Sequence, residues 1–353
     1  MSKQEKRVDI GGQAVMEGVM MRSPEAIAIA VRKPDGSIAI QHKPYISPAK
    51  KHKWMGWPFV RGVVSLVTML TSGMNTLETS ANMLGTEEEE PTKFEKWLSE
   101  KLGKDIDKVI MGVAVVLAVV LSLGLFVVIP SVCETFFESI GVSVIGTALL
   151  GGLVKILILI GYMVFCGAVP DVRRTFQYHG AEHKTVYCHE ADLPLKPENA
   201  QQFTTLHPRC GTAFLLIVFF VSILLFAVTS NFINGLPFIA NATNKVLKFL
   251  YRFLLHLALL PFVSGISYEI LKGLAHSEST LAKVLRWPGM QMQRLTTRQP
   301  DDKMLECAIV AMNCALYGLP QGKETTPEGY TLIHDYREAD PVLCKELEEQ
   351  KSE

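Results

Sequence analysis

The sequence predicts a mainly α-helical, polytopic membrane protein with about four spans, a small N-terminal β unit and cytoplasmic helices. Two observations predict this fold class. Hydrophobic residues make up 48% of the 353 positions and charged residues only 20%, which is unusual for a soluble globular protein. The charges are also segregated, because they crowd into roughly 1–108, 171–209 and 272–353, and the stretches between these segments are almost purely apolar.

Four apolar stretches are long enough to be spans, since a hydrocarbon core of about 30 Å needs about 20 helical residues. The second contains Lys155 near its middle, and the fourth contains His256 and Pro261, which makes it the weakest of the set. The four stretches are 109–130, 142–168, 211–228 and 248–268.

Lysine and arginine placement predicts the orientation. Basic residues are frequent before the first span, between the second and third spans, and after the fourth, whereas the connections 131–141 and 229–244 contain none. The positive-inside rule therefore predicts a multi-pass protein of the cell (plasma) membrane, with both termini and residues 171–210 in the cytoplasm. Thiols there stay reduced and free to bind metal. The seven cysteines form no CxxC pair, which disfavours a disulfide framework or a zinc ribbon.

Composition divides the chain into five expected segments. Residues 1–57 form a β-rich cytoplasmic unit, and 58–84 form an amphipathic helix that is interfacial or, alternatively, re-entrant. Residues 85–107 are an acidic linker with a short helix. Residues 108–274 are the four-span membrane domain, which includes the cytoplasmic His/Cys loop 171–210, and 275–353 are a cytoplasmic helical tail.

Local patterns add detail at both ends of the chain. Residues 26–31, then Pro34-Asp35-Gly36, then 38–40 predict strand, turn and strand, and the glycines within 11–22 suit a bend or a close backbone approach. In the tail, 287–300 is turn-rich, Asp301-Asp302 caps a helix over 303–316, and the last 35 residues are expected to be loosely ordered.

A His- and Cys-rich segment follows the second span. In a helix, His179 and His183 lie one turn apart on one face, the spacing that lets two imidazoles share a metal ion. With Glu182 they form the H-x-x-E-H pattern, in which the glutamate is the general base of a metal-dependent hydrolase. His207 and Cys210 complete the expected ligand set for a divalent metal, zinc or alternatively iron.

The HxxEH pattern also occurs by chance, and a histidine near a membrane is often only an amphipathic anchor. The clustering of four histidines and two cysteines between 179 and 210 carries the metal hypothesis. Four bound side chains would indicate a structural site, whereas three with an open position would indicate a catalytic one. The possible accessory residues are Glu17, Cys188, His189 and Glu269. Glu269 is expected nearer to this segment than to Lys155, which needs a partner or water at mid-span.

Four separated motifs resemble one family. They lie at 11–24, 178–184, 207–212 and 288–302, and the resemblance covers residues 8 to about 317. The chain is similar to the DUF1385 or YqhQ family of uncharacterised bacterial membrane proteins, which are sometimes labelled predicted metal-dependent enzymes. A glutamate is more usual in that family where Gln299 stands. The resemblance implies a membrane location and metal dependence, and it implies no reaction.

Three functions remain open. The first is a cytoplasm-facing membrane metalloprotein acting as a metal-dependent hydrolase. The second is a non-catalytic assembly or scaffold protein with a structural metal. The third, a small transporter that uses Lys155 and Glu269, is least favoured, because four spans are few and no inverted repeat is visible. The lipid bilayer is the expected partner. No nucleic acid is expected, because the formal net charge is zero and no basic block is interleaved with aromatics.

Overall fold

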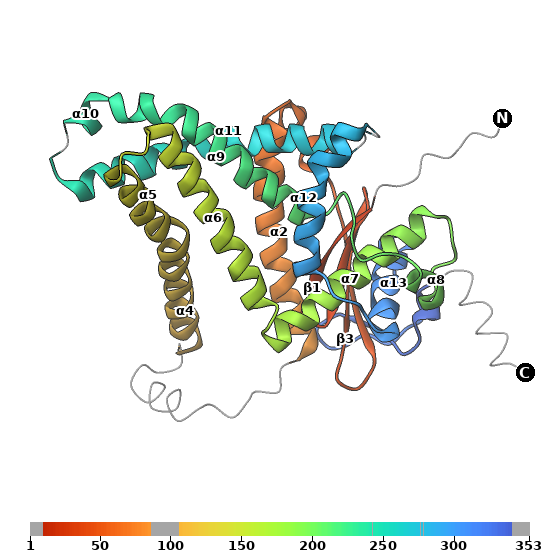
Figure 1. Cartoon of the computed structure of the whole chain (residues 1–353). Coiled ribbons are helices and arrows are strands. Elements are labelled where there is room, and N and C mark those ends of the chain that lie inside the picture. The colour runs from red at the N-terminus through yellow and green to blue at the C-terminus, as the bar shows by residue number, and fades with distance from the viewer. Residues whose placement is uncertain (1–9, 86–105, 242, 276, 278, 341–353) are drawn as a thin grey trace, which may run out of the picture. The chain divides into compact units, whose positions relative to one another are not determined.

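The computed structural model describes residues 10–85, 106–241, 243–275, 277 and 279–340 (Figure 1). The chain folds into two compact units. The first consists of 1–85, 163–218 and 264–353, and the second of 86–162 and 219–263. Most of the expected acidic linker and short helix at 85–107 lies outside the described residues.

A five-stranded antiparallel sheet is the centre of the first unit. Its strands are paired in the order of the chain, and the strand-turn-strand prediction for 26–40 is confirmed by β3 and β4. Residues 11–22, whose glycines were expected to serve a bend or a close backbone approach, form the hairpin β1–β2. The tail contributes the fifth strand, although loose order was expected there. The strands are β1 (Gly11–Val15), β2 (Gly18–Arg22), β3 (Ala26–Arg32), β4 (Ile38–Pro44) and β5 (Thr331–Ile333).

The sheet buries both faces, because side chains of a strand alternate between them. Along β3, Ala28 and Ala30 belong to one core cluster, whereas Ile29 and Val31 belong to another. The first cluster joins the sheet to α7 (Pro170–Glu190) and α13 (Asp302–Tyr317). The second includes Met83 of α2 (Val60–Leu84). Two helices on one face and one on the other therefore fix where α7 lies relative to the N-terminal hairpin.

The predicted tail helix is confirmed as α13. Asp301 is its N-cap and accepts a hydrogen bond from the Met304 amide at 2.8 Å. The helix is followed by its C-cap residue Gly318, whose φ is 89°. The turn-rich prediction for 287–300 was wrong, because α12 (Thr280–Thr296) continues through Pro288 and buries Gln293 and Thr296. The shorter elements of this unit are α1 (Pro48–Lys51), η1 (Lys53–Gly56), α8 (Pro197–Gln201) and η4 (Tyr336–Ala339).

The amphipathic helix expected at 58–84 is α2. Val67, Leu70, Met74 and Leu77 recur at helical spacing on it, and each is exposed by 41% or more. Such a stripe of large apolar side chains is suited to lipid or to another apolar surface rather than to water.

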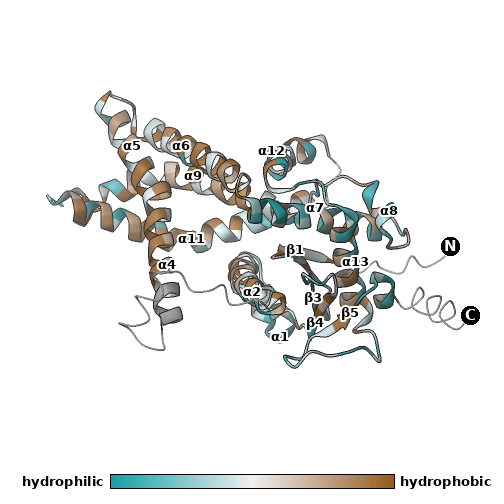
Figure 2. Ribbon diagram, turned by 90° about the horizontal axis from the view of Figure 1, so that it is seen from below, coloured by the Kyte–Doolittle hydropathy of each residue, from teal (hydrophilic) through white to brown (hydrophobic). Residues whose placement is uncertain are grey.

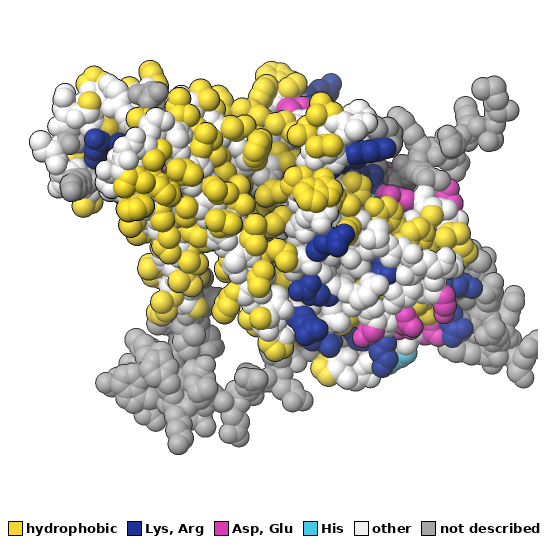
Figure 3. Space-filling model, viewed as in Figure 1, with side chains coloured by type: hydrophobic (Ala, Val, Ile, Leu, Met, Phe, Trp, Pro, Cys, Tyr) yellow, Lys and Arg dark blue, Asp and Glu magenta, His cyan; other side chains and the backbone are white. Residues whose placement is uncertain are grey.

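Apolar helices dominate the second unit, as the hydropathy colouring makes plain (Figure 2). Among the described residues, four helices are candidate membrane spans, at Gly112–Ser139, Val144–Cys166, Phe214–Gly235 and Val246–Leu274, which confirms the four-span prediction. Large hydrophobic side chains cover the face of α4 and α6 that Figure 3 shows. The elements that carry these spans are α4 (Ile106–Leu123), the π-helical turn η3 (Gly124–Val128), α5 (Ile129–Ser139), α6 (Val144–Cys166), α9 (Gly211–Gly235) and α11 (Lys245–Ala275), with the short α10 (Pro237–Ala240) before α11.

Candidate functional site

The segment 171–210, expected as a loop, is largely helical, and α7 carries the histidine pair. Pro170 at the start of α7 favours the first helical turn, and Asp171 interacts favourably with the helix N-terminus. Gly180 lies where α7 meets the chain after α12, and a Cβ at this position would overlap the carbonyl oxygen of Arg298. The glycine of the HxxEH motif therefore permits a close backbone approach.

Three of the four predicted metal ligands lie together. One nitrogen each of His179 and His183 and the Sγ of Cys210 are all within 4.8 Å of one another. The Nε2 of His179 is 3.2 Å from the Sγ of Cys210. His183 and Cys210 are buried, and His179 is partly buried. The helical spacing that suggested a shared ion therefore places both imidazoles beside the thiol.

Hydrogen bonds fix the tautomers of both histidines. Nδ1 of His179 is 2.9 Å from the carbonyl oxygen of Thr296, and Nδ1 of His183 is 2.5 Å from that of Thr205. A carbonyl can only accept, so each Nδ1 donates its proton and each neutral ring keeps a lone pair on Nε2. Burial also lowers the pKa of His183, which favours its neutral form. Both Nε2 atoms can consequently act as ligands, oriented by a carbonyl behind each ring.

Side chains of α7 hold the segment that leads to Cys210. The ammonium of Lys184, almost completely buried, donates to the carbonyl oxygens of Gln201 and Phe203 at 2.8 and 2.6 Å. The hydroxyl of Tyr187 donates to Leu206 at 3.1 Å. Buried backbone groups need such partners, so these contacts fix residues 201–206 against the helix.

Gln293 of α12 fixes the turn that contains His207. Its Oε1 accepts from the His207 amide at 2.7 Å, and its Nε2 donates to the His207 carbonyl at 2.8 Å. The Cys210 amide donates to the same carbonyl at 3.3 Å, and Cys210 immediately precedes α9. Sequence reasoning missed Gln293. The sequence pattern that could have indicated Gln293 is a polar residue at helical spacing from Gly289 and Thr296 and next to Met292, all of which are buried on α12.

His207, the fourth predicted ligand, lies beside the three without joining them. Its ring centre is 5.6 Å from that of His183, but its nitrogens lie outside the cluster of ligand atoms. The buried Nε2 makes no hydrogen bond among the described residues and lies 3.6 Å from a carboxylate oxygen of Glu190. Burial lowers the pKa of His207 to about 4, so the ring is neutral near pH 7.

Glu182 faces the N-terminal hairpin. It is buried, and desolvation raises the pKa of its carboxyl group, opposed by the electrostatic attraction of His179 and His207 and by a hydrogen bond from the Gly12 amide. A Cβ at position 12 would lie 2.8 Å from the Cγ of Glu182. The glycine expected to serve a close backbone approach therefore makes room for the predicted general base.

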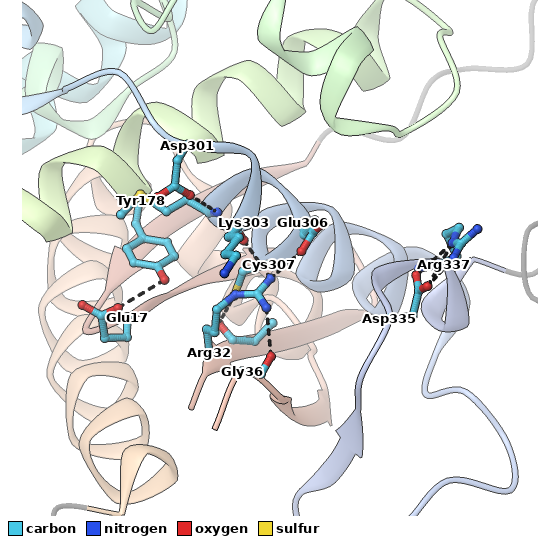
Figure 4. Close-up of polar contacts among 12 residues, drawn as sticks. Glu17, Arg32, Gly36, Tyr178, Asp301, Lys303, Glu306, Cys307, Asp335 and Arg337 are labelled. Carbon is cyan, nitrogen blue, oxygen red and sulfur yellow. Dashed lines mark hydrogen bonds and ion pairs between the residues drawn. The ribbon is translucent and has the colours of Figure 1, made fainter. Parts of the chain in front are cut away.

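The same hairpin brings Glu17 onto α7. Glu17 is at the hairpin turn, with a φ of 50°, and its carboxylate accepts two hydrogen bonds of 2.5 Å from Arg174. It also accepts a 3.4 Å bond from the Tyr178 hydroxyl, toward which it points in Figure 4. Glu17 thus supports the helix that carries His179, although Glu17 is not among the three clustered ligands.

The other possible accessory residues lie elsewhere. Cys188 is in the hydrophobic core, where burial raises the pKa of its thiol to about 11. His189 is outside the cluster of ligand atoms, one residue further along α7. Glu269 pairs with Arg61 at 2.5 Å, and Lys155 pairs with Glu134 at 3.4 Å. Neither Glu269 nor Lys155 belongs to the cluster of three ligand atoms.

Comparison with known proteins identifies the family. The family described as "Protein of unknown function (DUF1385)" matches residues 57–317. The chain belongs to the DUF1385 family. It is also similar to the uncharacterized protein YqhQ of Bacillus subtilis (strain 168), with 31% identity over 322 residues, which cover 89% of this chain and 94% of that protein. No solved structure matches this member of DUF1385.

Proposed function

We propose that this DUF1385 protein is a membrane metalloprotein in which His179, His183 and Cys210 hold one divalent metal ion. The observation that carries the proposal is the pair of Nδ1 hydrogen bonds to backbone carbonyls, which directs a lone pair of each ring toward the thiol. The Nε2 of His183 is buried without a hydrogen bond among the described residues, an arrangement that a bound ion would satisfy.

The ligand types support zinc, with iron as the alternative. Two imidazoles and one thiolate are a donor set typical of zinc, and three protein ligands leave a fourth position open, as in catalytic sites. An ion held there would supply a Lewis acid that lowers the pKa of a water molecule to about 7. The proposed activity is hydrolysis of a substrate that reaches this open position.

Glu182 is the proposed general base. Burial raises the pKa of the Glu182 carboxyl group, which makes the carboxylate a stronger base that can accept a proton and deliver it to a leaving group. The Gly12 amide orients the carboxylate by donating a hydrogen bond to it. His207 is neutral near pH 7, and its ring centre lies 5.6 Å from that of His183.

Metal analysis of the detergent-purified full chain tests the site. Wild-type protein and His189→Ala, a matched control on the same helix, are expected to contain about one equivalent of metal per chain. The double variant His179→Ala/His183→Ala is expected to contain none. Equal metal content in wild type and the double variant, or a wild type that stays empty after incubation with zinc, would refute the metal site.

A structural metal is the competing function, and the position of His207 favours it. The ring of His207 lies close enough to His183 that a side-chain rotation could complete a four-ligand site. Glu182→Gln separates the two functions. The hydrolase proposal expects this variant to bind metal but to lose turnover of a panel of chromogenic carboxylic, phosphoric and peptide substrates. If wild type and Glu182→Gln turn over a substrate at the same rate, Glu182 is not the general base.

The proposed location is the plasma membrane, with the site and both termini in the cytoplasm. The distribution of Lys and Arg between the four candidate spans supports this orientation. Two C-terminal fusions test this orientation. One carries alkaline phosphatase, which is active only outside the cytoplasm, and the other carries green fluorescent protein. We expect fluorescence without phosphatase activity, and the reverse result would invert the topology.

A further inference from the structure

The segment between β4 and α2, residues 46–59, is basic and rich in aromatic residues, and we call it the Trp/Lys segment. Ser47 caps α1 by accepting a hydrogen bond from the Lys50 amide at 3.3 Å, and η1 follows α1 directly. η1 packs on α1 and on α2, next to which α1 lies in Figure 2. The Trp/Lys segment is therefore folded and held against the start of the amphipathic helix.

Four large apolar side chains of this segment face outward, each exposed by 51% or more, namely Ile46, Trp54, Trp57 and Phe59. Phe59 directly precedes α2, whose exposed apolar stripe begins at Val67, so the two apolar surfaces follow one another along the chain. Tryptophan is enriched at the headgroup level of bilayers, because its ring is apolar and its N–H is polar. These side chains are therefore suited to a membrane surface rather than to water.

Three lysines accompany the aromatic side chains. Lys50, Lys51 and Lys53 are exposed and make no ion pair with any residue that the structure describes. The sequence contains no aspartate or glutamate between Asp35 and Glu78, so the segment has a formal charge of +3 with its histidine neutral. Basic residues next to a membrane-binding surface attract anionic lipid headgroups.

The charges of α2 leave these lysines unbalanced. Arg61, near the start of the helix, pairs with Glu269 at 2.5 Å, so that this glutamate already has its own cation. Glu78 is the only carboxylate in the sequence of α2. It lies about 27 Å along the helix from Val60, at about 1.5 Å per residue, which exceeds the distance over which exposed charges interact strongly in salt.

On the side of the sheet, a glutamate and an arginine lie together just before the segment. The Tyr45 amide donates to the carbonyl oxygen of Glu25 at 2.7 Å, and the guanidinium of Arg22 lies over the Tyr45 ring, 5.4 Å from its centre. The formal charges of Glu25 and Arg22 cancel. The positive charge of the Trp/Lys segment therefore persists in its folded surroundings.

We propose that the Trp/Lys segment binds the bilayer surface and selects anionic phospholipids, with its two tryptophans at the headgroup level and its three lysines on the phosphate groups. The aromatic rings supply apolar contact area, and each lysine near an anionic surface strengthens binding about fivefold. The segment contains none of the proposed metal ligands, so this proposal does not depend on the metal site.

Quenching of tryptophan fluorescence by brominated lipids tests the proposal on the full chain in phosphatidylcholine nanodiscs. The chain has four tryptophans, and Trp97→Phe/Trp287→Phe gives a reporter protein that keeps only Trp54 and Trp57. Brominated phosphatidylglycerol should reach half-maximal quenching at a mole fraction roughly tenfold or more below that of brominated phosphatidylcholine. High salt should remove most of this difference, because exposed charges are screened.

The lysine variant Lys50→Gln/Lys51→Gln/Lys53→Gln, made in the reporter protein, separates charge from apolar contact. We expect both brominated lipids to quench it at equal mole fractions, because only the tryptophans still bind the bilayer. A preference for phosphatidylglycerol that the lysine variant retains would overturn the selection of anionic lipid. If this variant does not fold, the salt dependence of the reporter protein decides, since a preference that salt leaves unchanged also contradicts the role of the lysines.

The matched control is Lys33→Gln/Lys196→Gln/Lys303→Gln, which removes three lysines of the first unit outside the segment. We expect it to keep the preference of the reporter protein, and loss of the preference would assign it to net charge rather than to the segment. Equal quenching of the reporter protein by the two lipids would also refute the selection of anionic lipid. Absence of quenching by either lipid would show that the segment is away from the bilayer and would overturn the whole proposal.

Discussion

The most informative single substitution outside the proposed ligands is Gln293→Ala. Gln293 is fully buried and makes two hydrogen bonds to the backbone of His207. In the variant, the His207 carbonyl still accepts a hydrogen bond from the Cys210 amide. Losing its bond from Gln293 therefore costs about 0.5–1.5 kcal/mol. The His207 amide is left without its partner, which costs about 1–3 kcal/mol. We expect a total loss of about 1.5–4.5 kcal/mol in the free energy of unfolding.

Thermal unfolding and zinc titration of the purified protein measure the two consequences. The melting temperature should fall by roughly 3 °C or more, given about 2–4 °C per kcal/mol for a unit of this size. Zinc should bind at least about tenfold more weakly, because the loosened turn also positions Cys210. Gln291→Ala is the control, since Gln291 is on the same helix and makes no hydrogen bond to any residue described. Equal stability and zinc affinity in the two variants would refute the role assigned to Gln293.

Three further predictions concern the surroundings of the ligands. Gly12→Ala should lower stability by about 1–3 kcal/mol, because the added methyl group crowds Glu182, and a melting temperature equal to wild type would contradict this. In metal-free protein, stability should fall as the pH drops from about 6.5 toward 4, because the unfolded chain binds a proton that the neutral, buried His207 does not. His207→Gln should flatten this dependence, which pH-dependent melting curves measure. Zinc should protect Cys210 from alkylation by N-ethylmaleimide, as mass spectrometry of the modified peptide can test, and equal labelling with and without zinc would argue against the thiol as a ligand.

Local sequence patterns predicted the elements whose stability is local. The four spans follow from long apolar runs, and α13 follows from its Asp301 cap and its apolar spacing. The C-terminal half of α12 could not be predicted in this way, because Pro288-Gly289 reads as a turn. Met292 and Thr296 are buried in the first unit, and this packing stabilises the helix despite the unfavourable Pro288 and Gly289. The strand β5 was missed because only its pairing with β4, far away in the chain, orders it.

The candidate site also has some features that local sequence predicts and others that depend on distant segments of the chain. The spacing of His179 and His183 on one helix is a local property, and proximity in sequence suggested Cys210. The position of His207 depends on Gln293, 86 residues further along the chain. No local spacing could indicate that the ring of His207 lies beside the ligand cluster rather than in it. The role of Glu17 similarly required a hairpin that only the sheet defines.

The arrangement of the cluster is costly unless something binds there. A buried polar atom without a partner costs about 1–3 kcal/mol, and His183 and His207 each have such an Nε2 among the described residues. The chain nevertheless positions these rings with a buried glutamine, a buried lysine and two backbone carbonyls from distant segments. An apolar core would stabilise the same helices without any of these polar groups. The supports hold the ligand nitrogens of His179 and His183 within 4.8 Å of one thiol, and the metal proposal rests on this convergence.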